Sequence, residues 1–484
     1  MGFFSLESDS FGMQDYEDMG KKIRIYKNAL KKGKAFSSDL FSSELLEEII
    51  DYCIEKDKMN DALDFCNFWL EISPYSTDAL QRHGYILINL NRSGEALRSF
   101  NKALSLNPTD TFSLLHKSYA LGDVGKTNSA LRIVNQILEY EPDNEEALFH
   151  KGILLEDKKR YREAIEIFDY LTNSEAFAKE AYEEIAFSYH NLKEFDKSLE
   201  YFNYAIDEDP YDYDTWYNRG VFHSQNKQYQ SAIDCFDMAL AIKEDLFLAW
   251  HYKGNTYAFM GKINESINSF KEGLKYKPFD MDTLYNLASV YGDSGNYAEA
   301  IKYFSLVISV QPKHSQSYFG RGVCYDAIEK FEDALNDYNT ALSLDKNNPE
   351  IYYAKADLLF NLNRIPESLK CYEKVLDLQP LNYECLLDYI NTLSEFDKNA
   401  DIFTLLKRLI SIAPEWTEGY YALSKYYTKQ KNTEKAIENL KIALSLDPSK
   451  EKDFYVDFAE YLEDDELKKF FDFFLNWKPK ANLN

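Results

Sequence analysis

The prolines of this 484-residue chain fall in one register. Nine of its twelve prolines are separated by 34 residues or by a multiple of 34: Pro74, Pro108, Pro142, Pro210, Pro278, Pro312, Pro380, Pro414 and Pro448. The register is missed only at Ala176, Glu244 and Lys346. A fixed period of this length is typical of stacked helical hairpins. The chain is therefore predicted to be a linear array of repeats rather than one compact core.

The register divides the chain into three parts. With each proline at position 32, twelve repeats of 34 residues fill residues 43–450 without an insertion or a deletion. Residues 1–42 are predicted to be an N-terminal extension and capping segment, with a basic stretch at 21–34. Residues 451–484 are predicted to be a partial repeat and a C-terminal capping helix, because a stack needs ends that turn a polar face to water.

Each repeat has the pattern of two amphipathic helices. Apolar or small residues recur at positions 4, 8 and 11 and again at 20, 24 and 27, the spacing of one helix face. Position 4 is large and apolar in all twelve repeats, and position 24 is most often Phe. Positions 8 and 20 are usually small, which predicts a close approach of the two helices there. The position-32 proline ends the second helix, and a capping side chain precedes most first helices.

Repeat 6 displays the pattern clearly. It carries Trp216, Gly220, Ala232, Phe236 and Ala239 at positions 4, 8, 20, 24 and 27. This pattern resembles the tetratricopeptide repeat over about five-sixths of the chain. The resemblance implies an all-α fold, a right-handed α-solenoid superhelix of stacked helical hairpins, with the first helices lining a concave inner face. It also implies a protein that binds other proteins.

Repeat 11 departs from the pattern. Ile390 and Ile402 replace the small residues at positions 8 and 20. Two bulky side chains at the helix crossing predict that these helices lie further apart and that the pitch changes locally.

Position 5, which the resemblance places on the inner face, is aromatic in many repeats. The residues form what we call the position-5 row: Phe149, Tyr217, His251, Tyr285, Phe319, Tyr353 and Tyr421. One interpretation is a peptide-binding row in which each ring offers a large contact area, outside the core of its own repeat. The alternative is that the rings pack between adjacent first helices.

Polar residues accompany this row. Asn218 and Asn286 at position 6 and Asn255 at position 9 are further candidates for peptide binding. Position 2 is acidic in nine of twelve repeats, which complements the helix dipole and also favours a basic partner segment.

The basic stretch of residues 21–34 contains seven positive charges and no acid: Lys21, Lys22, Arg24, Lys27, Lys31, Lys32 and Lys34. One interpretation is a solvated face of a capping helix. The other is a docking contact with an anionic surface, such as a membrane complex or a ribosome.

Composition and motifs disfavour several classes of function. The 55 basic and 81 acidic residues give a net charge of −26, which argues against nucleic acid as the main ligand. No apolar run is long enough to span a bilayer. Gly125-Lys126-Thr127 lacks the first glycine of a phosphate-binding loop, since Ala120 stands there. His116 and His150 share position 6 of adjacent repeats and are expected to approach each other, without a third metal ligand.

The sequence thus predicts a non-enzymatic scaffold that binds extended or basic protein segments in a concave groove, without catalytic residues, metal or cofactor. The first alternative is an accessory subunit of a larger assembly, docked through its termini to a membrane export channel, a ribosome or envelope machinery. An enzyme is the less favoured alternative. Six scattered cysteines without a Cys-x-x-Cys pair predict a cytoplasmic location, and the Lys-rich, Asn-rich composition suggests a bacterial source.

Overall fold

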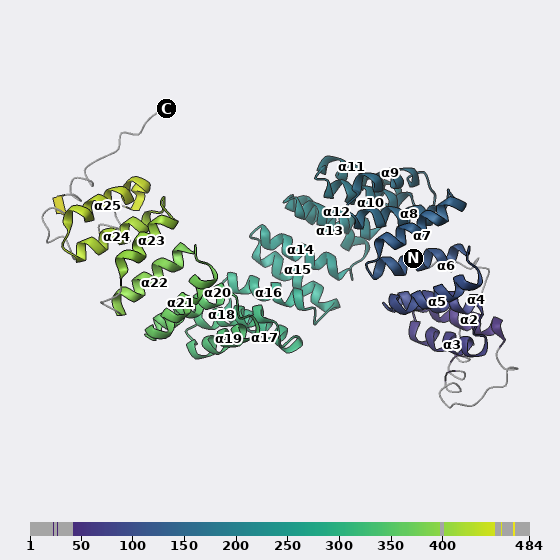
Figure 1. Ribbon diagram of the computed structural model, residues 1–484, viewed down its shortest axis with the longest axis horizontal. Helices are drawn as coiled ribbons and strands as arrows, with labels where there is room; N and C mark the ends of the chain where they lie inside the picture. Colours follow the sequence, from purple (N-terminus) through teal and green to yellow (C-terminus); the bar gives the residue numbers. More distant parts are fainter. Residues whose placement is uncertain are drawn as a thin grey trace. The chain divides into compact units, whose positions relative to one another are not determined.

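The described part of the chain is entirely helical. A computed structural model describes residues 23, 27, 42–396, 401–450, 456, 468 and 469, and in these residues it contains 24 α-helices, a short 3₁₀-helix and no strand (Figure 1). Two helices recur every 34 residues, so the predicted all-α solenoid of helical hairpins is confirmed. The termini assigned to capping segments lie almost wholly outside the described residues, and their roles remain predictions.

Tertiary contacts divide the chain into two compact units, Met1–Glu244 and Asp245–Asn484. The first unit holds repeats 1–6. Its first helices are α2 (Ser43–Glu55), α4 (Thr77–Asn89), α6 (Thr111–Asp123), α8 (Glu145–Asp157), α10 (Ala178–Asn191) and α12 (Tyr213–Gln225). Its second helices are α3 (Met59–Ile72), α5 (Ser93–Leu106), α7 (Thr127–Tyr140), α9 (Tyr161–Leu171), α11 (Phe195–Glu208) and α13 (Tyr229–Ile242).

The second unit holds repeats 7–12. Its first helices are α14 (Phe247–Phe259), α16 (Met281–Asp293), α18 (Ser315–Ala327), α20 (Pro349–Asn361), α22 (Tyr383–Phe396) and α24 (Thr417–Lys429). Its second helices are α15 (Ile263–Tyr276), α17 (Tyr297–Val310), α19 (Phe331–Leu344), α21 (Ile365–Leu378), α23 (Ile402–Ile412) and α25 (Thr433–Leu446), followed by the 3₁₀-helix η1 (Pro448–Lys450).

The turn inside each repeat depends on one left-handed residue. Every residue with positive φ in the described part of the chain stands at position 15 of its repeat, from Asp57 to Lys431. Three of them are glycines, and the others include Lys227 with a φ of 59°. A single left-handed residue ends the first helix and releases the chain into the second. Position 15 thus sets the turn of each described repeat, and most repeats use a residue other than glycine there.

The first helices are capped as the sequence predicts. A side-chain oxygen accepts a backbone N–H of the first turn at seven predicted positions: Ser76, Asp110, Asn144, Asp212, Asp280, Asn348 and Asn382. Each cap satisfies an amide that has no partner inside the helix.

The two helices of a repeat meet closely at positions 8 and 20. Where one of these positions is Ser, its hydroxyl donates to the backbone oxygen of the other, as from Ser198 Oγ to Ala186 O at 2.7 Å and from Ser424 Oγ to Ala436 O at 2.7 Å. Position 24 places a buried ring beside the same crossing, for example Phe168 and Phe270. The predicted close contact is thus confirmed.

Successive first helices contact one another directly within each unit, as α4 with α6 and α14 with α16 do. Side chains on the exposed surface of these helices therefore belong to a surface shared by neighbouring repeats. We call this surface the first-helix face. We define it by positions 2, 5, 6, 9, 12 and 13, whose side chains range from exposed, as at Asn218, to buried, as at His150.

Repeat 11 differs from its neighbours. Its second helix, α23, begins at Ile402, which is position 20, whereas most second helices begin at position 17. Ile390 is buried beside Leu386, Leu406 and Leu409. The predicted widening of this repeat and the change of pitch remain predictions.

Candidate functional site on the first helices

The position-5 row packs against the core of its own repeats. In six repeats the position-5 ring lies 5.3–6.2 Å, centroid to centroid, from the ring at position 24: Phe149 with Phe168, Tyr217 with Phe236, His251 with Phe270, Tyr285 with Phe304, Phe319 with Tyr338 and Tyr353 with Tyr372. The expectation that these rings lie outside the core of their own repeat is therefore wrong. The helical spacing aims position 5 between the two helices as well as toward the first-helix face.

Several position-5 side chains also reach the next repeat. Phe149 lies 5.4 Å from Phe177, the residue that precedes α10. The Tyr353 hydroxyl donates to Asp388 Oδ2 on α22. These contacts favour the alternative that the rings pack between first helices. All seven residues nevertheless remain half-buried, so each ring keeps an edge accessible on the first-helix face.

The three predicted asparagines differ in their surroundings. Asn218 is exposed. Asn255 and Asn286 are half-buried and bonded to each other, with Asn286 Nδ2 donating to Asn255 Oδ1 at 2.9 Å. Asn255 Nδ2 is also 3.0 Å from His251 Nε2. The structure thus brings three of the predicted site residues into one network on α14 and α16.

Three carboxylates that the sequence reading did not single out share the first-helix face of the second unit. Asp326, Asp357 and Asp388 occupy positions 12, 9 and 6 on α18, α20 and α22. Burial raises the pKa of Asp357, and the charges of Asp388 and Asp326 raise it further. Tyr372 donates a hydrogen bond of 2.6 Å to Asp357 Oδ1. The aspartate stands about one helical turn earlier in each successive repeat. Comparing the same position across repeats therefore does not reveal the three aspartates as a group.

The first unit has buried acids on the same face. Burial and the neighbouring Glu184 raise the pKa of Glu156 to about 9, and Ser188 Oγ donates to Glu156 Oε1 at 2.6 Å. Burial also raises the pKa of Glu183 to about 7. Glu156 and Glu183 therefore bind a proton more strongly than an exposed glutamate does, on the surface formed by α8 and α10.

Apolar side chains on this face were also missed. Phe187 at position 9 is 48% exposed and Phe259 at position 13 is 72% exposed. Both positions belong to the inner surface that the resemblance implies. The signal in the sequence is an aromatic residue at position 9 or 13, which are inner positions just as position 5 is.

His116 and His150 lie in neighbouring repeats, and the Tyr119 ring contacts both, at centroid distances of 5.7 and 4.1 Å. His116 Nδ1 lies 3.0 Å from Phe112 O, and His150 Nε2 lies 3.0 Å from Ser118 Oγ. Burial lowers the pKa of each imidazole to about 4. Both rings are therefore neutral members of an aromatic cluster at neutral pH.

Only one basic residue of the predicted docking segment, Lys27, is described. The Lys27 ammonium forms an ion pair with Asp61 of α3, and Ile23, one helical turn earlier, is buried against the core of repeat 1. These contacts favour the capping interpretation for this turn. Lys21, Lys22, Arg24, Lys31, Lys32 and Lys34 lie outside the described residues, and their docking role remains a prediction.

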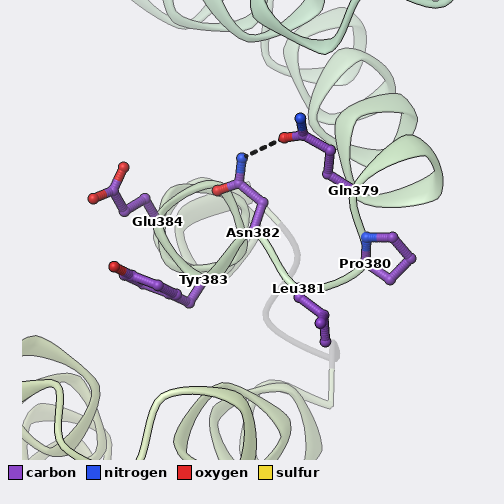
Figure 2. A pocket seen from close by; sticks show the side chains of 6 residues that line it. All are labelled: Gln379, Pro380, Leu381, Asn382, Tyr383 and Glu384. Carbon is purple, nitrogen blue, oxygen red and sulfur yellow. Dashed lines mark hydrogen bonds between the residues drawn. The ribbon is translucent and has the colours of Figure 1, made fainter. Parts of the chain in front are cut away.

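A separate cavity lies at the turn between repeats 10 and 11. It has a volume of about 500 Å³ and is lined by Gln379, Pro380, Leu381, Asn382, Tyr383 and Glu384 (Figure 2). Asn382 Nδ2 donates to Gln379 Oε1 across its rim at 3.0 Å (Figure 2). None of the predicted binding residues lines it.

The helices and the recurring contacts define a helical-repeat protein with an accessible face on its first helices. Sequence profiles described as tetratricopeptide repeat match residues 77–110, 116–181, 179–212, 213–246, 248–280, 280–347, 349–382 and 417–450. The chain therefore belongs to the tetratricopeptide-repeat family, whose members are in general protein–protein interaction scaffolds without enzymatic activity. The matched ranges leave out residues 383–416, the divergent repeat 11.

Three solved structures illustrate the similarity of this chain to other helical proteins. YrrB, described as a tetratricopeptide-repeat protein with an unusual peptide-binding site, is 20% identical, with 39% of this chain and 96% of YrrB covered and a TM-score of 0.35. Cut9–Hcn1 of the APC/C is 12% identical, with 84% and 94% covered and a TM-score of 0.38. PilF of Pseudomonas aeruginosa is 17% identical, with 42% and 92% covered and a TM-score of 0.37. A comparison with curated proteins gives no match.

Among the described residues, no helix combines the length and the apolar character that crossing a membrane requires. All six cysteines are buried and form no disulfide.

Proposed function

We propose that the protein is a non-enzymatic scaffold that binds an extended, basic segment of another protein along its first-helix face. The observation that carries this proposal is the placement of Asp326, Asp357 and Asp388 on three successive first helices. No ion pair joins any of these carboxylates to Lys or Arg in the part of the chain that the structure describes. A partner segment with Lys or Arg side chains would supply the missing positive charges.

Aromatic rings beside these carboxylates support the same proposal. Tyr353 donates to Asp388, and the buried Tyr372 donates to Asp357, so the two carboxylates and the half-buried Tyr353 ring are held in fixed orientations. Rigid aromatic side chains give contact area at little cost in conformational entropy. One carboxylate on each of three successive repeats, with a half-buried ring at position 5 in two of them (Phe319 and Tyr353), suits an extended segment better than a globular surface. We also infer that the protein works in a reducing, cytoplasmic environment, since its six cysteines form no disulfide.

The test compares two charge-matched variants of the full chain. The first carries Asp326→Asn, Asp357→Asn and Asp388→Asn. The second carries Glu332→Gln, Asp333→Asn and Asp377→Asn on the second helices α19 and α21. Both are offered an array of short peptides rich in Lys and Arg, with Gln-substituted peptides for comparison.

The wild type and the second variant should capture the basic peptides, and capture should weaken with added salt. The first variant should lose on the order of tenfold in affinity. If both variants bind equally well, the three aspartates are not the binding site. If the wild type captures no peptide, the first-helix face does not hold extended basic segments.

A further inference from the structure

Exposed apolar side chains recur on three successive second helices of the first unit. Tyr170 on α9, Tyr204 on α11 and Met238 on α13 all stand at position 26, and they are 55%, 41% and 44% exposed. The other repeats contain no such run. Their position-26 residues are Phe68, Lys102, Gln136, Glu272, Leu306, Thr340, Lys374, Arg408 and Ile442. A single exposed apolar residue is ordinary, but a row of them on one surface indicates an interaction site.

A row of carboxylates accompanies these apolar side chains. Glu166, Glu200 and Asp234 stand at position 22, one helical turn before the apolar residue of the same repeat. Residues four apart are neighbours on a helix surface, and the Tyr204 hydroxyl donates to Glu200 Oε1 at 2.7 Å. Repeats 4–6 are the only successive repeats with an acid at position 22. We call the six residues at positions 22 and 26 of these repeats the second-helix patch.

Aromatic rings of the first helices extend the apolar surface between neighbouring second helices. The helix α10 contacts both α9 and α11, and α12 contacts both α11 and α13. The half-buried Tyr182 ring on α10 lies 5.6 Å from the Tyr204 ring, centroid to centroid. Trp216 has the equivalent position on α12, where its Nε1 donates to Pro210 O at 3.0 Å. The patch is therefore part of one surface shared by three repeats.

The chain provides few positive charges near this patch. Among the described residues, no ion pair joins its three carboxylates to Lys or Arg. The only cations on α9, α11 and α13 are Arg162 and Lys197, and both pair with Glu194. Arg219 of α12 lies over the Trp216 ring. The patch thus carries a net negative charge, which favours a partner with positive charge.

We propose that the second-helix patch is a docking site for a basic amphipathic helix of a partner protein. The apolar face of that helix packs on the position-26 row, and its Lys or Arg side chains reach the carboxylates at position 22. A helix presents an apolar stripe with a polar flank beside it, whereas an extended segment directs successive side chains to opposite sides. Two adjoining rows, one apolar and one acidic, therefore fit a helix. The site is separate from the aspartates on α18, α20 and α22 and does not depend on the proposed function.

The test uses the full chain and a defined probe, a stapled helical peptide of about 21 residues, roughly 30 Å long. The peptide has Leu along one face, Lys on the flanks and a nitroxide at one end. One comparison peptide has the same composition with the Leu positions scrambled, and another has Glu in place of Lys. Nuclear magnetic resonance of labelled methionine methyl groups locates the bound peptide, with Met238→Leu used for assignment. The nitroxide should broaden the Met238 signal and leave Met59 on α3 unchanged.

Variants of the apolar row test the contact directly. The patch variant carries Tyr170→Gln, Tyr204→Gln and Met238→Gln. Its control carries Leu306→Gln and Ile442→Gln, which change the same position where the apolar residue is isolated. The patch variant should bind the basic helix on the order of tenfold more weakly than the wild type and the control. A double variant that leaves Tyr204 unchanged serves if circular dichroism shows that the triple change alters the fold.

Charge is tested with a second set of variants. Changing Glu166 and Glu200 to Gln and Asp234 to Asn should weaken binding of the basic helix and reduce its dependence on salt. The triple aspartate variant of the first-helix face should bind this peptide as the wild type does. That comparison separates a failure of the patch from a failure of the proposed function.

Several results would overturn the proposal. One is a wild type that binds the basic helix no more tightly than the scrambled peptide or the Glu peptide. Others are patch variants that bind as the wild type does, or a nitroxide that broadens Met59 rather than Met238. If the wild type self-associates in sedimentation and the patch variant does not, the occupant is a second copy of this chain and the proposed partner helix is wrong.

Discussion

A β-carbon added to Gly220 would lie 2.6 Å from Cε1 of Phe236, closer than such atoms approach in folded proteins. Gly220 lies at position 8 of α12, and Phe236 lies at position 24 of α13. The same relationship joins Gly152 to Phe168, with a nearest distance of 2.3 Å. The ring occupies the space that a side chain would need, so the two positions share one volume.

The first prediction follows from this shared volume. Gly220→Ala should lower the free energy of unfolding by about 1–3 kcal/mol, because the ring must move or the helices must separate. The matched control is Gly94→Ala on α5, where an added β-carbon meets nothing within 4 Å. That change should be neutral or slightly stabilising. Urea unfolding measures both, and equal midpoints for the two variants would contradict the assignment.

Other repeats indicate how the strain could be relieved. Ile50 stands at position 8 of repeat 1, with the smaller Cys66 at position 24. Combining Gly220→Ala with Phe236→Leu should therefore cost less than the sum of the two single changes.

A second prediction concerns the position-5 row. Tyr285 packs edge-to-face on Phe304 at 5.7 Å and also contacts His314, which precedes α18. Tyr285→Ala should lower the free energy of unfolding by about 1–3 kcal/mol, from the lost ring contacts and the cavity left behind. Phe187→Ala, which removes a more exposed ring from the first-helix face of α10, should cost much less. Equal losses in thermal unfolding would mean that Tyr285 is not part of the repeat core.

A third prediction concerns pH. The pKa of Glu156 rises from 4.5 to about 9 through burial and the nearby Glu184. Between these values the folded protein holds a proton that the unfolded chain releases. Stability should therefore fall as pH rises through this range, with the penalty complete above the folded value.

Glu156→Gln removes this penalty, because the amide stays neutral at every pH. The variant should unfold at higher urea concentration than the wild type in alkaline buffer, and the difference should shrink on acidification. Glu166→Gln, at an exposed site on α9, serves as the control. A wild type and a Glu156→Gln variant with parallel pH profiles would show that the carboxyl pair does not hold the proton.

A fourth prediction concerns the basic segment. If it docks on an anionic surface, changing Lys21, Lys22 and Arg24 to Glu should release the protein from membranes or ribosomes in cell fractionation. Lys27 is left unchanged because it forms an ion pair with Asp61. Its substitution would change the stability of the fold as well as any docking contact. Added salt should release the wild type as well. A wild type that never sediments with either fraction would rule the docking role out.

The sequence by itself determined the repeat length, the helix pairs and their ends. These features depend on short-range patterns: a proline that cannot continue a helix, a capping side chain such as Asp280 two residues later, and small residues at the crossing. Each acts within one repeat of 34 residues, and the pattern recurs twelve times. Because the same short-range signals recur at the same positions of each repeat, they determine the helix pairs along the whole array.

Only the tertiary structure decided what the side chains of the first-helix face do. The sequence predicted that position 5 lies outside the core of its own repeat. Helical periodicity indicates on which side of a helix a residue lies, but not which side chains it contacts. The bonds from Tyr353 to Asp388 and from His251 to Thr283 join residues 35 and 32 positions apart. Such contacts depend on how neighbouring hairpins stack and which rotamers then fit. No single repeat contains that information, so these hydrogen bonds between repeats exist only in the stacked array.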